Sequence, residues 1–228
     1  MALLHHKKFL ALFGAIVAVL FAPAAAPAAS GTTVTVRVEG LKRTLSASTV
    51  VHTKTGWITK AGTPSGQCPA ASAAGALDLA TRHRWDGSYS STLGLEITTI
   101  LGETHAFSSP YFWSIWVDNK FAPAGACGLK LHRGEQLLFA AVPIKGTTYP
   151  TAIRAPRSAN AGHAFTVTVV WFNGKGKARP LAGASVDGKK TDSRGSVQII
   201  PTQAGTLTLH AGKAGFIRAA AVQVRVLA

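Results

Sequence analysis

The stretch YFWSIWVDNKFAPAGACGLKLHRGEQLLF, residues 111–139, decides the fold that we expect for the rest of the chain. Side chains alternate between the two faces of a strand, so Phe112 and Trp116 share one face and the odd-numbered residues share the other. Both faces are therefore partly apolar. Asp118–Asn119 suits a tight hairpin turn with positive φ, and Arg133–Gly134 suits a second turn. The stretch predicts a meander of strands.

The N-terminal residues have the three parts of a secretory signal peptide. Two lysines precede an apolar run from Phe9 to Phe21, and small residues follow it. We expect residues 1–28 to be removed by cleavage after Ala28, or alternatively after Ala26. A membrane anchor is the competing interpretation, but a run of about 13 apolar residues is short for a bilayer. The sequence predicts a secreted protein, cell-wall associated or free, with no transmembrane anchor.

Two cysteines, Cys68 and Cys127, follow the leader. An exported chain with an even number of cysteines usually pairs them, so we predict one disulfide. Two free thiols or metal ligands are the alternative. Neither cysteine has a CxxC partner or a histidine at ligand spacing, which argues against a metal site.

Positive charge is concentrated in the C-terminal third. Without the leader lysines the chain has 22 Lys and Arg against 9 Asp and Glu, a formal charge of +13. Residues 31–142 account for +3 and residues 143–228 for +10. A field of one sign attracts polyanions without specifying a partner. We expect an anionic cell-wall polymer as one partner, with a merely solvated surface as the alternative. Export argues against nucleic acid.

Residues 31–142 form the first predicted domain. A strand with valine at alternate positions is expected to begin at Thr32, and residues 45–51 are its expected hairpin partner. A helix is expected after Pro69, which suits the first helical position. Trp85 and Tyr89 are placed in a loop, and the apolar segment GLEITTIL follows them.

A Pro/Gly/Thr linker, residues 143–152, separates this domain from the second one at 153–228. In the second domain short apolar stretches recur at hairpin spacing, centred on Val169, Val186, Val197, Leu207 and Val224. No helix pattern interrupts them, which is typical of a β-sandwich. The predicted fold class is mainly β: an α+β, β-grasp-like N-terminal domain followed by an all-β, immunoglobulin-like sandwich.

Residues 32–142 resemble the transcobalamin-like C-terminal domain family of exported bacterial proteins. The resemblance is carried by TVRVEG, the Ala/Leu helix, YFW with WVDNKFAPAGA, and LHRGEQLLF. Asp118–Asn119 stands where the family usually has Asn-Gly, and Glu135 stands where it usually has Asp. The resemblance implies a β-grasp variant that binds a small soluble ligand. In the transcobalamins that ligand is a cobalamin, shared with a helical domain that this sequence does not contain.

The second domain resembles immunoglobulin-like and carboxypeptidase-regulatory-like modules of bacterial surface proteins. The stretches PLAGASVDGKKTDSRGSV and AGTLTLHAGKAGF carry this resemblance. Such modules act as spacers or adhesive units, which is what the resemblance implies for residues 153–228.

Catalytic signatures are absent from the sequence. GASVD at residues 183–187 lacks the last glycine of a nucleophile elbow. The histidines after the leader show no HxH or HExxH spacing, so we predict no metal site and no cofactor. Glu96 and Glu103 are interpreted as solvated residues. The predicted protein is a non-enzymatic binding or surface protein. An extracellular hydrolase assembled by the fold and a structural spacer are the alternatives.

Aromatic residues supply the candidate ligand site, because aromatics with a polar edge are favoured where small molecules or sugars stack. Trp113 shares a face with apolar neighbours and is expected in the core. Phe112 and Trp116 point the opposite way and are the main candidates for a face that binds a small molecule or glycan. Tyr111 and Trp85 complete the predicted set.

Overall fold

The computed structural model describes residues 31–106 and 108–228. The predicted signal peptide, residues 1–28, lies outside them. The described chain is mainly β, as predicted, and we treat it as an N-terminal part (residues 31–143) and a C-terminal part (residues 149–228). No helix among the described residues is long and apolar enough to cross a membrane.

The N-terminal part contains eight strands and two short helices. They are β1 (Thr33–Glu39), β2 (Thr44–His52), η1 (Lys60–Gly62), α1 (Ala73–Ala80), β3 (Trp85–Ser90), β4 (Gly94–Ile100), β5 (Glu103–Thr104), β6 (Tyr111–Val117), β7 (Lys120–Phe121) and β8 (Gln136–Pro143). Five of the strands form one sheet in the order β2-β1-β8-β6-β7, and β3, β4 and β5 form a separate ribbon.

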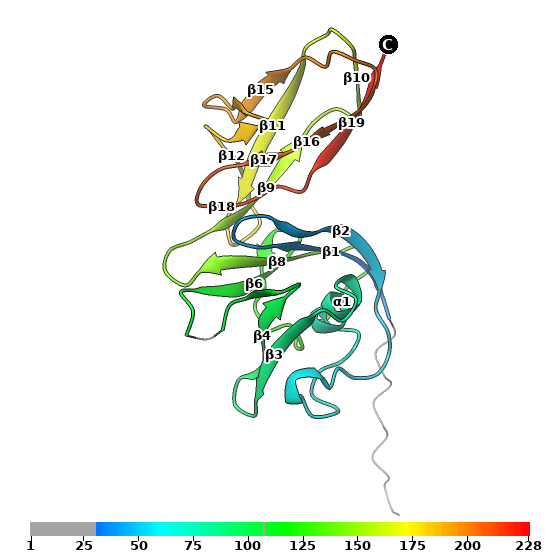
Figure 1. Cartoon of the computed structure of the whole chain (residues 1–228), viewed down its shortest axis with the longest axis vertical. Coiled ribbons are helices and arrows are strands. Elements are labelled where there is room, and N and C mark those ends of the chain that lie inside the picture. Colours follow the sequence, from blue (N-terminus) through cyan, green and yellow to red (C-terminus); the bar gives the residue numbers. More distant parts are fainter. Residues whose placement is uncertain (1–30, 107) are drawn as a thin grey trace, which may run out of the picture.

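The five-stranded sheet, which we call the central sheet, is covered on both faces over its middle strands β1, β8 and β6. Val36 and Phe139 point to a core shared with α1 and the β3–β4 ribbon. Leu138, Ala140 and Trp116 point the other way, into a cluster that includes Ile217 of the C-terminal part. Figure 1 shows α1 and the ribbon on one side of the central sheet and the C-terminal part on the other. The two partly apolar faces predicted for residues 111–117 are explained by these two layers.

The C-terminal part consists entirely of strands and loops. Its strands are β9 (Tyr149–Arg154), β10 (Ser158–Asn160), β11 (Phe165–Phe172), β12 (Ala178–Pro180), β13 (Ser185–Val186), β14 (Lys189–Lys190), β15 (Ser196–Ile199), β16 (Gly205–Leu209), β17 (Ala211–Gly212), β18 (Phe216–Ile217) and β19 (Val222–Leu227). The largest sheet has the order β12-β11-β9-β18 with β15 paired to β11, and a second sheet has the order β10-β19-β16. Alternating valines of β11 and β19 fill the core between them.

Three sets of contacts join the two parts. An aromatic ladder runs from the central sheet into the C-terminal part, with ring centroids 5.1, 6.4, 5.1 and 6.0 Å apart in the order Phe121, Trp116, Tyr149, Trp171, Phe216. Arg218 binds Glu39 of β1, with Nε 3.0 Å from Oε2. The backbone N–H of Phe121 donates to the carbonyl of Gly174 at 3.1 Å. The C-terminal part therefore covers one face of the central sheet.

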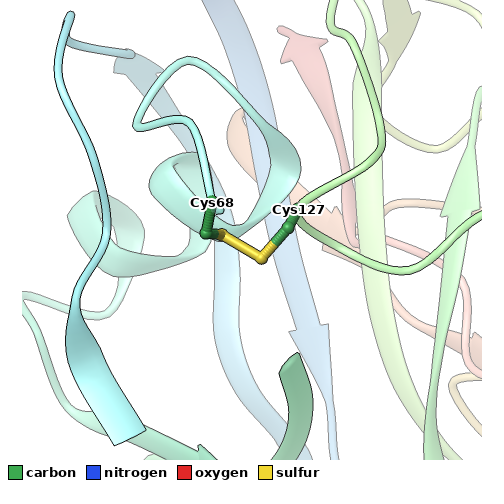
Figure 2. The surroundings of a disulfide bond; sticks show 2 residues. All are labelled: Cys68 and Cys127. Carbon is green, nitrogen blue, oxygen red and sulfur yellow. A yellow bond between two sulfur atoms is a disulfide. The ribbon is translucent and has the colours of Figure 1, made fainter. Parts of the chain in front are cut away.

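The predicted disulfide is confirmed. Cys68 and Cys127 are bonded, with their Cα atoms 4.7 Å apart. Figure 2 shows the bond tying the segment before α1 to the long loop between β7 and β8. The two cysteines are 59 positions apart in the sequence, so the bond closes a long loop. The bond staples the helix layer of the N-terminal part to the loop that leaves the central sheet.

The predicted hairpin turn is confirmed, whereas three other local predictions differ from the structure. Asp118 and Asn119 have φ of 47° and 62°, as the predicted hairpin turn requires. The helix begins at Ala73 and not after Pro69, because Pro69 is held in an isolated β-bridge with Trp57. The predicted loop around Trp85 is wrong, since these residues pair with β4 as strand β3. Strand β9 begins at Tyr149, inside the predicted linker 143–152.

Candidate ligand-binding cleft

A mostly apolar cleft of about 610 Å³ opens at the edge of the N-terminal part. One wall is the outer face of the β3–β4 ribbon, with Ser88, Ser90 and Glu96. The opposite wall is formed by Tyr111 and Phe112 at the start of β6, together with other apolar residues. Those residues are Ala106 and Ile144, and Leu93 lines the cleft from the turn between β3 and β4.

Strand alternation explains the polar wall. In β3 and β4, Trp85, Leu95 and Ile97 are buried in the core of the N-terminal part. Ser88 and Glu96, which face each other across the ribbon, therefore point to the opposite side. The ribbon thus offers hydroxyl and carboxylate groups to the cleft while its other face packs inward.

The apolar wall is held by contacts at the ends of β6 and β8. The backbone N–H of Ile144 donates to the carbonyl of Pro110 at 2.9 Å, which places Ile144 beside the first residues of β6. The backbone N–H of Tyr111 donates to Oγ of Ser109 at 3.2 Å. Leu93 and Ile144 are 78% and 55% exposed, although both side chains are large and apolar. Such residues mark a binding site when they gather around a cleft.

A buried histidine supports the tyrosine from behind. The His105 ring lies 5.8 Å from the Tyr111 ring and 5.2 Å from the Trp113 ring, measured between centroids. Its Nε2 atom is 2.9 Å from Oε1 of Glu103, and His105 is buried. These contacts hold the Tyr111 ring in place, and neither His105 nor Glu103 is among the residues that line the cleft.

The chemistry of the cleft suits binding. Glu96 is the single carboxylate among the lining residues that the structure describes. Acid–base catalysis by paired carboxylates needs a second one nearby. Within residues 31–106 and 108–228, no three His, Cys, Asp or Glu side chains gather as metal ligands would. The arrangement offers aromatic and aliphatic surface with a few polar groups along one wall.

Of the four predicted ligand residues, Tyr111 and Phe112 lie together in the cleft. Trp116 does not, because the C-terminal part covers its face of the sheet and leaves it 3% exposed. Its Nε1 donates to Oγ of Ser114 at 3.0 Å. The expectation that Phe112 and Trp116 share an open ligand face is therefore wrong for Trp116. Trp113 lies in the core, as expected.

Trp85 is also a structural residue. It is 3% exposed, and its Nε1 donates to Oδ1 of Asp78 at 2.7 Å. The Nζ atom of Lys60 lies 5.1 Å from the ring centroid. Because Trp85 begins a strand that packs under α1, its ring faces the core and not the cleft.

Sequence reasoning missed Leu93, Ala106 and Ile144. They lie in or next to turns, far apart along the chain, and only the fold brings them to Tyr111. The one available signal was a large apolar residue in a turn: Leu93 follows a run of small polar residues, and Ile144 begins a Gly/Thr stretch.

Comparison with known proteins yields a weak structural likeness. No protein-family model matches the chain, and neither does any curated protein. Among solved structures, the chain is similar to one described as a putative metal binding protein from Ruminococcus gnavus. That likeness has 17% sequence identity and a TM-score of 0.35, and covers 49% of this chain and 97% of the other. At this level it carries no argument about function.

Proposed function

We propose that the protein is an exported, non-enzymatic binding protein whose N-terminal part holds a small, mainly apolar ligand in the cleft beside Tyr111 and Phe112. The observation that carries the proposal is the cleft itself. Its volume of about 610 Å³ falls within the range of small-molecule sites, and apolar walls with a few polar groups are typical of them. The half-buried Phe112 and the exposed Leu93 and Ile144 supply surface that a ligand would cover.

The cleft favours an apolar molecule with one polar edge over a glycan. Ser88, Ser90 and Glu96 lie along one wall. The Tyr111 hydroxyl is the one side-chain hydrogen-bonding group among the lining residues of the other wall, so most polar groups of the ligand are met on one side. A sugar presents hydroxyls around its whole rim, and several of them would face aliphatic side chains here. Unpaired polar groups of that kind weaken binding.

The first test uses the neutral dye N-phenyl-1-naphthylamine, which becomes fluorescent in apolar sites. Ile144→Asp places a charge at the cleft, and Ile200→Asp is its matched control because the two side chains are 55% and 53% exposed. We expect Ile144→Asp to weaken dye binding by about tenfold or more and Ile200→Asp to leave it unchanged. Equal dye titrations for the two variants would contradict the proposal.

We propose a second role for the C-terminal part, attachment to an anionic cell-wall polymer. Six exposed basic side chains lie in one segment, from Lys175 to Arg194. The two acids of that segment are engaged locally: Oδ1 of Asp192 accepts from two backbone N–H groups of its own turn, and the Asp187 carboxylate accepts from His210. The segment keeps a net positive charge that can face a polyanion.

Soluble poly(glycerol phosphate) is the probe for this second role. One variant replaces four lysines of the segment with Gln, and a control variant replaces four exposed lysines elsewhere, so both lose the same charge. The first set is Lys175, Lys177, Lys189 and Lys190, and the control set is Lys42, Lys54, Lys130 and Lys145. We expect salt-sensitive binding that the first variant loses and the control retains. An equal loss of polymer binding in both variants would mean that binding depends on the total charge of the protein and not on this segment.

A further inference from the structure

A second groove lies where the N-terminal and C-terminal parts meet, away from the cleft. It has a volume of about 380 Å³ and is bordered by β1 and β2 on one side and by residues 219–223 on the other. A smaller cavity of about 110 Å³ adjoins the same place. Arg37, Ser48 and Ala220 line both of them.

Arg37 is the central residue of this groove. It points to the face of β1 opposite the valine core and is 8% exposed. Its Nη1 atom donates to Oε1 of Glu39 at 2.6 Å and to the carbonyl of Arg218 at 2.8 Å. Both bonds use the same nitrogen, so the other edge of the guanidinium, Nε and Nη2, is not occupied by them.

That other edge has no hydrogen-bond partner in the described chain. Among residues 31–106 and 108–228, no group forms a hydrogen bond with Nε or Nη2 of Arg37. The buried side-chain atoms without a partner in the described chain are hydroxyls of Thr63 and Ser72, and the Arg37 nitrogens are not among them. Nε and Nη2 are therefore not fully enclosed, and Arg37 is a lining residue of the groove. They form a side-on pair of donors of the kind that binds a carboxylate with two parallel bonds.

The charge balance also calls for an anion. Arg37 and Arg218 share one carboxylate, Glu39, whose oxygens accept from both arginines and from Oγ1 of Thr44. One positive charge is left over in this cluster, where Arg37 and Glu39 are buried and the Arg218 side chain is 32% exposed. Burial lowers the pKa of Arg37, attraction by Glu39 opposes this, and repulsion from Arg218 lowers the pKa further. Because Arg37 is buried and shares its carboxylate with Arg218, a bound anion beside Arg37 would offset part of the cost of burying its charge.

We propose that this groove is a binding site for a small carboxylate anion, held side-on by Nε and Nη2 of Arg37. Thr208 and Gln223 place hydroxyl and amide groups at the same groove, where they can bind the polar end of the anion. The alanines at 219–221 leave room for a short aliphatic group. This site is independent of the cleft beside Tyr111, and either can exist without the other.

Acetate is the probe. The full chain, labelled with ¹⁵N, is titrated with sodium acetate and, separately, with sodium chloride at constant ionic strength, while the arginine Nε–Hε signals are followed by NMR. We expect one arginine signal to shift saturably with acetate, with a dissociation constant on the order of millimolar. Chloride, which cannot form two parallel bonds, should leave it nearly unmoved. The same linear drift in both salts would overturn the proposal.

Two variants assign the signal. Arg37→Lys keeps the charge but removes the paired Nε and Nη2 donors. It should abolish both the shifting arginine signal and the saturable response to acetate. Its matched control is Arg154→Lys, an exposed arginine of β9 that lines neither cavity. Ala220→Leu fills the groove with Arg37 in place and should weaken acetate binding at least tenfold. If Arg37→Lys does not fold, Ala220→Leu decides alone: acetate binding unchanged in that variant would refute the site.

Discussion

Replacing Trp116 with alanine separates two interpretations of the same residue. As a ligand-face residue, Trp116 would contribute little to stability, and its loss would weaken ligand binding. In the structure it is 3% exposed and packs edge-on against Phe121 and at 69° to Tyr149, so it joins the two parts of the chain. The variant Trp116→Ala should therefore unfold more easily and bind the cleft dye normally.

The size of the effect follows from the burial. Truncating a buried Trp to Ala costs about 3–5 kcal/mol. Two neighbouring aromatic rings each lose an edge contact, worth about 0.5–1.5 kcal/mol, which raises the cost within this range. The Ser114 hydroxyl limits the loss, since it still donates to the carbonyl of Ala140 at 2.9 Å after the indole is gone. The expected loss of unfolding free energy is about 4 kcal/mol.

Urea unfolding followed by far-ultraviolet circular dichroism measures this loss. Trp57→Ala is the matched control, because Trp57 lies in a loop and is 50% exposed. Its loss should cost less than about 1 kcal/mol, as exposed substitutions usually do. If Trp116→Ala keeps the wild-type stability but no longer binds the dye, the structural role of Trp116 is refuted and a ligand face on that side of the sheet is restored.

Three further predictions concern stability and use the same urea assay. Glu39→Gln leaves two arginines without their shared carboxylate and should cost about 3–5 kcal/mol, whereas Glu96→Gln in the cleft should cost less than about 0.5 kcal/mol; equal costs would contradict the buried ion cluster. Gly75→Ala would place a Cβ 1.9 Å from a backbone oxygen and should cost about 1–3 kcal/mol, but Gly125→Ala, with nothing within 4 Å, should be neutral. Reducing the disulfide should cost up to about 4 kcal/mol and release two titratable thiols; two free thiols in the unfolded but unreduced protein, or no loss of stability after reduction, would contradict this.

Much of the fold could be predicted from short-range patterns. The Asp118–Asn119 turn needs side chains that tolerate positive φ, and the valine alternation of β19 marks its buried face; both signals lie within a few residues of sequence. The β3 strand was missed for the converse reason. WDGSYS is rich in Asp, Gly and Ser, which are not typical strand formers, and its pairing with β4 and its packing under α1 stabilise it.

Two of the four ligand residues that the sequence predicts line the cleft, and two do not. Alternation states which residues share a face of a strand, but not what covers that face. Tyr111 and Phe112 are the first two residues of β6, and they line the cleft. Trp116 is on the same face of β6 as Phe112, but it lies where the C-terminal part packs. Docking of residues more than 30 positions away decided the difference between the two. Leu93 and Ile144 reach the cleft through tertiary contacts alone.

The aromatic ladder has a consequence for anyone who divides this protein. A cut in the loop 144–148 would bare Trp116, Leu138 and Val142 on one fragment and Ile217 on the other. Each fragment produced by itself would expose these apolar side chains, and it should therefore aggregate and precipitate. Mixed in equal amounts, the two fragments should instead bind each other, because each carries one side of the same hydrophobic interface.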